Sequence, residues 1–151
     1  MQQNRLSEDV TPLGKSSPYF YMKKLRFKCT RCGCCCINAG SEFVYLGENE
    51  AEKIRKYLGV SSAWFRRRYI KRDKDEGLVL RFPENGRCEF LDNSNRCNIY
   101  PVRPGQCKTY PFWRELVTSA QGWVAEKSRC EGIGSGAVVP VNHIENMLGK
   151  K

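Results

Sequence analysis

The spacing of apolar positions along the chain predicts three helices. In residues 48–58, apolar side chains recur on one helical face behind an acidic first turn, and Gly59 stands where such a helix would end. A second helix is expected over residues 61–70, and a third over residues 141–148. No segment of the sequence repeats another, so these helices do not indicate a repeat architecture.

Alternation of apolar and polar side chains predicts short strands between the helices. Residues 25–28, 43–46 and 78–82 are candidates for such strands. Residues 113–124 are interpreted as a hairpin that turns at residues 119–122. Helices and strands are therefore mixed along the chain, and the predicted fold class is α+β, a small domain with short strands and a few helices.

Two stretches are predicted to be irregular. Residues 93–111 carry proline or glycine at positions 101, 104, 105 and 111, which excludes a long helix or strand there. Residues 132–136 are glycine-rich and are interpreted as a flexible bend, because they match neither of the common phosphate-loop patterns.

Residues 1–18 are polar and are interpreted as a flexible N-terminal tail, which leaves residues 19–151 as one domain.

Cysteine is the residue type that changes this picture most. The chain has nine cysteines among 151 residues, and five of them fall between Cys29 and Cys36. Two residues separate Cys29 from Cys32, and two separate Cys32 from Cys35, a spacing that lets sulfur atoms converge on one soft cation or cluster. The later cysteines fall in loop-like sequence, and we expect Cys97 and Cys107 to lie on bends.

Setting Cys34 aside leaves eight thiols, which make two sets of the four that a tetrahedral zinc or a cubane cluster requires. Neighbouring Cys35 and Cys36 point in different directions on a strand or a helix, which favours two adjoining sites that take one thiol each. Cys34 is interpreted as a spare thiol, with a redox-active thiolate as the alternative. The eight predicted metal ligands are Cys29, Cys32, Cys35, Cys36, Cys88, Cys97, Cys107 and Cys130.

The spacing of the cysteines leaves the metal open. The first three cysteines of the pattern match the first three ligands of a bacterial-type ferredoxin run, but no Cys-Pro follows at the fourth position. A zinc ribbon needs a second Cys-x2-Cys pair, and the later cysteines are too far apart to supply one. We favour a four-iron (4Fe-4S) iron–sulfur cluster in at least one site, with zinc in both sites as the alternative.

Taken together, these motifs resemble the CxxCxxCC cysteine-cluster family of zinc- or iron-chelating or iron–sulfur proteins. The resemblance covers about residues 29–136 and implies a metal- or cluster-binding domain. Cys34 departs from the pattern by placing a thiol in a variable position. The linked elements are Cys29-x2-Cys32-Gly33-x-Cys35-Cys36, Gly86-Arg87-Cys88-x-Phe90-Leu91, Cys97-x-Ile99-Tyr100-x2-Arg103-Pro104-x2-Cys107-x2-Tyr110-Pro111-Phe112 and Cys130-x-Gly132-Ile133-Gly134.

The compartment and function follow from the cysteines as expectations. An odd number of thiols and an N-terminus without an apolar run argue against disulfides and a secretory signal, so we expect a cytoplasmic protein without membrane association. We interpret it as an accessory in redox chemistry, metal handling or protein modification that acts with a protein partner. A similar cysteine cluster occurs in bacterial flagellin lysine-N-methylases, which implies an S-adenosylmethionine-dependent protein methylase as the alternative. No catalytic or cofactor-binding residue is assigned, and enzyme activity stays open.

The formal net charge of +10 permits a nucleic-acid partner as a further alternative. If the helix over residues 61–70 continued slightly, Trp64, Arg67, Arg68 and Lys71 would share one face, which could bind RNA or a ribosome. A solvated helix face is the simpler interpretation. His143 is the only histidine in the chain, and we expect it on the surface or in packing rather than at a metal.

Overall fold

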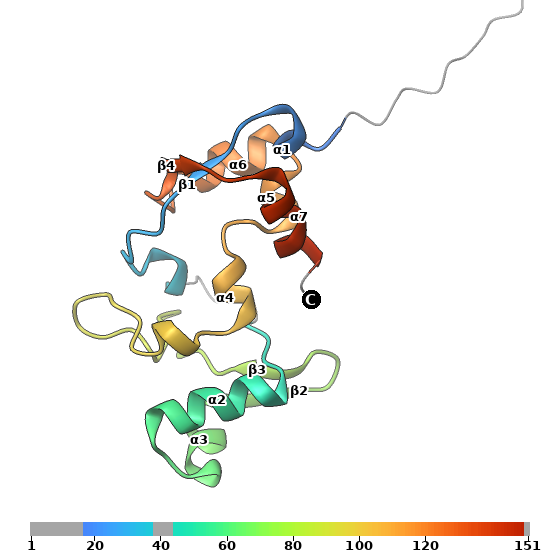
Figure 1. Ribbon diagram of the computed structural model, residues 1–151. Coiled ribbons are helices and arrows are strands. Elements are labelled where there is room, and N and C mark those ends of the chain that lie inside the picture. The colour runs from blue at the N-terminus through green and yellow to red at the C-terminus, as the bar shows by residue number, and fades with distance from the viewer. Residues whose placement is uncertain (1–16, 38–43, 150–151) are drawn as a thin grey trace, which may run out of the picture.

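The computed structural model describes residues 17–37 and 44–149, so the predicted tail lies outside the described residues except for Ser17 and Pro18. Helices and two antiparallel two-stranded sheets confirm the α+β class. The elements are α1 (Tyr19–Met22), β1 (Arg26–Phe27), the 3-10 helix η1 (Cys34–Cys36), α2 (Glu48–Leu58), α3 (Ser62–Tyr69), β2 (Ile70–Asp73), β3 (Gly77–Leu80), the 3-10 helix η2 (Tyr100–Val102), α4 (Gly105–Thr109), α5 (Arg114–Val117), α6 (Ala120–Glu126), β4 (Ile133–Val138) and α7 (Val141–Gly149) (Figure 1).

The first of two hydrophobic cores forms where α2 and α3 pack against the β2–β3 hairpin. Ile54, Phe65 and Leu80 are buried together in this α2–α3 core. The helices form as predicted, because local signals define their ends. The Ser61 hydroxyl accepts a hydrogen bond from the backbone N–H of Trp64 at the start of α3, and Gly59 ends α2 at a φ of 67°.

The second core joins both ends of the described chain. Strand β1 pairs antiparallel with β4, so that Arg26 lies opposite Val138. Helices α5, α6 and α7 pack beside this pair, and Phe112, Trp123 and Ile144 are buried among them in what we call the α6–α7 core.

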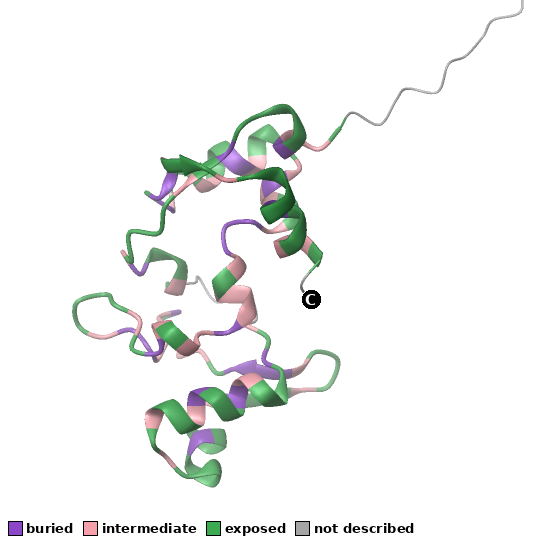
Figure 2. Cartoon of the chain, viewed as in Figure 1, coloured by how far each residue is buried: buried purple, intermediate pink, exposed green. Residues whose placement is uncertain are grey.

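The segment between the two cores carries the cysteines. Figure 1 shows the elements of the α6–α7 core at one end of the molecule, those of the α2–α3 core at the other, and α4 between them. Cys130 belongs to the α6–α7 core, whereas Cys88 and Cys97 pack against the α2–α3 core. Figure 2 shows that the chain between the cores is largely exposed or half-buried, and Cys130 alone among the nine cysteines is buried. The cysteines therefore lie at the seam between two separate cores.

The sequence predictions for residues 113–124 and for residues 132–136 are wrong. Residues 113–124 form α5 and α6 rather than a hairpin, because the Ser119 hydroxyl accepts a hydrogen bond from the N–H of Gly122 and so begins a helix. Residues 132–136 are not a flexible bend, since most of them belong to β4. Their glycines permit close strand approach: a Cβ at Gly132 would lie 2.4 Å from the carbonyl oxygen of Lys28. This segment therefore gives no support to a cofactor-binding loop.

The basic helix face predicted from Trp64, Arg67, Arg68 and Lys71 is only partly present in the structure. The helix ends at Tyr69 and Lys71 lies on β2, so Lys71 does not share the helical face of Trp64, Arg67 and Arg68. The Arg68 guanidinium makes two hydrogen bonds to the Glu89 carboxylate, at 2.7 and 3.1 Å. Part of the positive charge that was expected to bind nucleic acid is thus paired with a carboxylate of the protein itself.

The remaining strand predictions are close to the structure. Tyr45 forms a single antiparallel bridge to Val79, and the predicted strand over residues 78–82 ends at Leu80 as β3. Phe43, the first residue of the strand predicted before α2, lies outside the described residues. None of the helices in the described ranges combines the length and apolar character needed to cross a bilayer.

Candidate metal centre

All nine cysteines of the chain line one cavity of about 110 Å³. They reach it from four places: the run that begins at Cys29, the loop that carries Cys88 and Cys97, helix α4, and the residues before β4. The described residues that line the cavity include no aspartate, glutamate or histidine. The donor set is therefore made of sulfur, the donor preferred by zinc and by iron–sulfur clusters.

The first cysteine run turns at Gly33, which has a φ of 78°. The N–H of Cys36 donates to the carbonyl oxygen of Gly33 at 2.9 Å and starts η1. A Cβ at Gly33 would lie only 2.2 Å from the carbonyl oxygen of Asn95. Glycine thus allows the first cysteine turn to rest directly on the turn that precedes Cys97.

The loop over residues 88–97 is held against this run by backbone hydrogen bonds. The N–H of Cys88 donates to the carbonyl oxygen of Cys36 at 2.8 Å. Within the loop, Leu91 and Cys97 form an antiparallel bridge, and the Arg87 guanidinium donates to the carbonyl oxygen of Asp92 at 2.6 Å. These contacts bring Cys88 and Cys97 to the sulfur atom of Cys36.

Cys36 is the centre of one group of thiols. Its Sγ lies 4.0 Å from the Sγ of Cys35, and it also forms hydrogen bonds with Cys88 and Cys97. These hydrogen bonds raise the pKa of the Cys36 thiol, since they favour its protonated form. The hydrogen bond with Cys36 lowers the pKa of Cys35 and Cys97 to about 7.

Cys107 lies beside this group on helix α4, and not on a bend as the sequence predicts. Pro104 stands directly before the first residue of α4, where a proline is tolerated, and Pro111 follows soon after its last residue, so the prolines flank a short helix without preventing it. Burial, together with the charges of Cys88, Cys35 and Cys97, raises the pKa of the Cys107 thiol to about 12.

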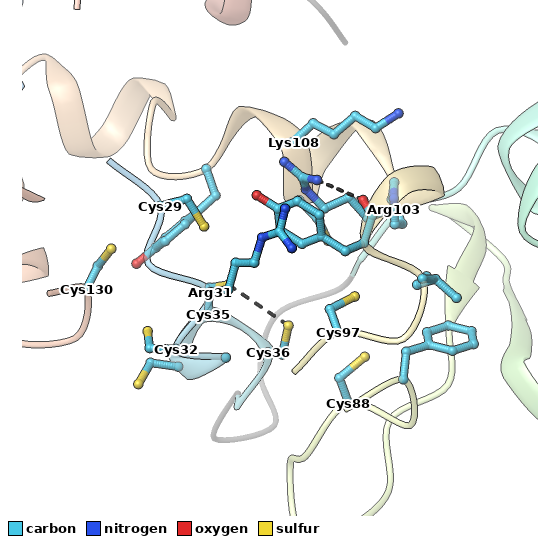
Figure 3. Close-up of a pocket in the computed structure, with 18 of the residues that line it drawn as sticks. Cys29, Arg31, Cys32, Cys35, Cys36, Cys88, Cys97, Arg103, Lys108 and Cys130 are labelled. Carbon is cyan, nitrogen blue, oxygen red and sulfur yellow. Dashed lines mark hydrogen bonds between the residues drawn. The ribbon is translucent and has the colours of Figure 1, made fainter. Parts of the chain in front are cut away.

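A second group of thiols lies on the side of the α6–α7 core. Figure 3 shows Cys32 and Cys130 on one side of the cavity and Cys36, Cys88 and Cys97 on the other. The hydrogen bond with Cys32 raises the pKa of Cys34, so the thiol predicted to be spare also lines this side.

Cys130 is the buried member of this second group. Burial raises the pKa of its thiol, and hydrogen bonds from the backbone N–H groups of Gly132 and Ile133 counter that rise. The Tyr110 hydroxyl, beside this thiol in the cavity lining, donates to the Glu126 carboxylate at 2.6 Å.

The thiols lie near one another but do not form a complete set of metal ligands. In residues 17–37 and 44–149, no three or more His, Cys, Asp or Glu side chains are grouped so that they could hold a metal ion as they stand. Their sulfur chemistry fits zinc or iron, and the hydrogen-bonded group around Cys36 is the closest approach to a ligand set. His143 is exposed on α7 and does not line the cavity, in agreement with the surface role expected for it.

Two residues that line the cavity or support it are absent from the sequence predictions. Arg129 lines the cavity, and its guanidinium donates to the carbonyl oxygen of Ile37 at 3.1 Å. Its position directly before Cys130 was the available signal. Glu126, which accepts the hydrogen bond of Tyr110, carried no signal in the sequence.

Comparisons with known proteins agree with this donor set. Residues 28–131 match the model of the CxxCxxCC family, described as a "putative zinc- or iron-chelating domain". An uncharacterized protein of Methanocaldococcus jannaschii is 29% identical over 94 residues, which are 61% of this chain and 48% of that protein. The chain thus matches about half the length of that relative. No solved structure shows a significant match.

Proposed function

The chain belongs to the CxxCxxCC family, and from that premise we propose that its cysteine-lined cavity binds zinc or iron through two adjoining sets of four thiolates. The observation that carries the proposal is that nine cysteines from four parts of the chain line a single cavity. Eight of these are the proposed ligands, and Cys34 is not required.

The first proposed site consists of Cys36, Cys88, Cys97 and Cys107. Hydrogen bonds already link Cys36 with Cys88 and Cys97 as well as with Cys35, and the charges of the same three cysteines act on Cys107. In a tetrahedral zinc site with Zn–S bonds of about 2.3 Å, neighbouring sulfurs lie about 3.8 Å apart, close to hydrogen-bonding distance between thiols. A cubane cluster places iron and sulfide between its ligands and would spread them. The hydrogen bonds among these thiols are the observation that supports a single ion such as zinc in the first site.

The second proposed site consists of Cys29, Cys32, Cys35 and Cys130. Cys32 and Cys130 lie on the same side of the cavity (Figure 3). Assigning Cys35 here and Cys36 to the first site completes four ligands in each. The 4.0 Å between their sulfurs then separates ligands of neighbouring sites.

An iron–sulfur cluster is the second candidate for this site. The observation that favours it is the spacing of Cys29, Cys32 and Cys35, which matches three ligands of a ferredoxin run with a fourth supplied from elsewhere.

Metal bound in the two sites would also link the two cores, because Cys130 belongs to one while Cys88 and Cys97 pack against the other.

Cobalt titration of the reduced, metal-free protein tests the two ligand sets. Thiolate-to-cobalt charge-transfer absorption should saturate at about two ions per chain, as eight thiolates allow. Cys88→Ser should remove the first site, and Cys32→Ser should remove the second. The matched control Cys34→Ser should keep the full stoichiometry. Absence of thiolate absorption, or equal loss in Cys34→Ser and Cys32→Ser, would contradict the proposed ligands.

A further inference from the structure

Four basic residues share the cavity with the cysteines. Arg31, Arg103, Lys108 and Arg129 all line it, and the described lining contains no carboxylate to balance them. Figure 3 shows Arg31, Arg103 and Lys108 on one side of the Cys36, Cys88 and Cys97 sulfurs. We call these three residues the basic rim.

Two guanidinium groups of the rim stack on one aromatic ring. The Cζ atom of Arg31 lies 4.2 Å from the centroid of the Tyr100 ring, and that of Arg103 lies 3.8 Å from it. Arg103 also donates to the carbonyl oxygen of Tyr100 at 2.8 Å, which fixes its orientation. A guanidinium that stacks by its face keeps N–H groups at its edge, and such an edge binds a carboxylate with two parallel hydrogen bonds.

The backbone of Arg31 is unusual as well. Its φ of 59° lies in the left-handed region, which is strained for a residue with a long side chain. This conformation accompanies the position of its side chain over Tyr100. Strained positions of this kind are concentrated at binding sites, where surrounding structure maintains them.

The rim residues are also without acidic partners inside the protein. Arg55, Arg66, Arg68 and Arg72 form salt bridges with Glu48, Glu52 or Glu89. Across the part of the chain that the structure describes, no salt bridge involves Arg31, Arg103 or Lys108. Arg31 and Lys108 are exposed, so an anion can reach them from solvent.

We propose that the basic rim binds the carboxylate groups of a carrier that delivers the metal ion to the cysteines. This inference rests on the proposed metal-binding function. In the exchange, bonds from the metal to carboxylate oxygens break and bonds to thiolate sulfurs form. Each entering thiol releases its proton to solvent, and no electron is transferred. The carrier is a small polycarboxylate or an acidic protein segment, and the shared chemistry is the carboxylate.

Charge gives the exchange a direction. Before delivery, each thiol that is still protonated is neutral, so the four cations of the cavity are less fully balanced and attract an anionic carrier. After delivery, a divalent ion with four thiolates carries a net charge of −2, which offsets the cations and weakens their hold on the emptied carrier. Carboxylate binding should therefore be tighter in the metal-free protein than in the zinc-loaded protein.

Calorimetry of citrate binding to the reduced, metal-free protein at low ionic strength tests the proposal. Citrate should bind the unmodified protein, and R31Q/K108Q should weaken this binding at least about tenfold, the loss expected for charge-assisted hydrogen bonds. The control K53Q/K74Q removes the same charge from exposed lysines that do not line the cavity, and it should bind citrate almost normally. Equal affinity in the two double variants, or no citrate binding at all, would overturn the proposal.

Hexaglutamate in place of citrate identifies the source of the carboxylate. Tighter binding of hexaglutamate supports an acidic protein segment, and tighter binding of citrate supports a small carrier. Zinc stoichiometry measured with zinc chloride separates this inference from the proposed function. Normal zinc binding without carboxylate binding overturns the rim alone, whereas failure of the unmodified protein to bind zinc overturns the metal site itself. Normal zinc stoichiometry in R31Q/K108Q shows that the variant is folded.

Discussion

Replacing Gly33 by alanine should destabilise the protein more than the same change at Gly59. Both glycines have a left-handed backbone, with φ values of 78° and 67°. A Cβ at Gly33 would lie 2.2 Å from the carbonyl oxygen of Asn95 and 3.0 Å from Cδ2 of Leu91, whereas a Cβ at Gly59 would meet nothing within 4 Å. The two substitutions therefore share the backbone cost and differ in the contact.

The size of the difference follows from how firmly Asn95 is held. The Asp92 carboxylate accepts hydrogen bonds from the N–H groups of Ser94 and Arg96, each at 2.8 Å, and Arg87 donates to the Asn95 side chain at 2.7 Å. A left-handed backbone costs an L-residue about 1–2 kcal/mol. Displacing the held turn adds about 1–3 kcal/mol, as overpacking does in cores. Gly33→Ala should thus cost about 2–5 kcal/mol, against about 1–2 kcal/mol for Gly59→Ala.

Urea unfolding of the metal-free proteins measures both free energies, and competition with a chelator measures zinc affinity. Gly33→Ala should also weaken zinc binding, because the displaced turns carry Cys36 and Cys97, while Gly59→Ala should leave zinc affinity unchanged. If the two variants lose the same stability and both bind zinc normally, the close packing of the cysteine turns is refuted.

Two further predictions concern thiol reactivity and the support of α4. In the metal-free protein at pH 7.5, iodoacetamide should modify Cys35 well before Cys107, because their pKa values are about 7 and about 12 and only the thiolate reacts. Peptide mass mapping over time checks this order, and equal rates would contradict it. Glu50→Ala should destabilise the protein by about 1–3 kcal/mol, because its carboxylate accepts hydrogen bonds at the starts of both α2 and α4. The control Glu52→Ala removes two surface salt bridges, with Arg55 and Lys56, and should cost less than about 1 kcal/mol in the same thermal or urea unfolding experiment.

The sequence predicts the elements whose ends are set by neighbouring residues. Helix α2 has an acidic first turn and Gly59 directly behind it, and both signals lie within the segment itself. Strand β4 was missed because its partner β1 lies more than a hundred residues earlier in the chain, and glycine-rich sequence gives no strand signal without that partner. Residues 119–122 were predicted as a turn because a serine followed three residues later by a glycine suits either a turn or the start of a helix.

In the candidate site, too, local sequence predicts some features and tertiary contacts decide the others. The cysteine spacing identifies thiolate ligands, since the cysteine side chain itself supplies the sulfur donor. The grouping of the cysteines depends on tertiary contacts, such as the hydrogen bond from Cys88 to Cys36, that no local pattern reveals. The stacking of Arg31 and Arg103 on Tyr100 is invisible in the sequence for the same reason.

Metal and acid-labile sulfide analysis of the anaerobically purified protein, together with its visible absorption spectrum, tests the central claim most directly. Thiolate-bound metal in about two sites per chain is the predicted result, as eight ligands allow. A colourless protein with two zinc ions would assign zinc to both sites. A brown protein with zinc, iron and sulfide would assign a cluster to the site of Cys29, Cys32, Cys35 and Cys130. A folded, fully reduced protein that retains neither zinc nor iron, and binds neither when they are added back, would contradict the account.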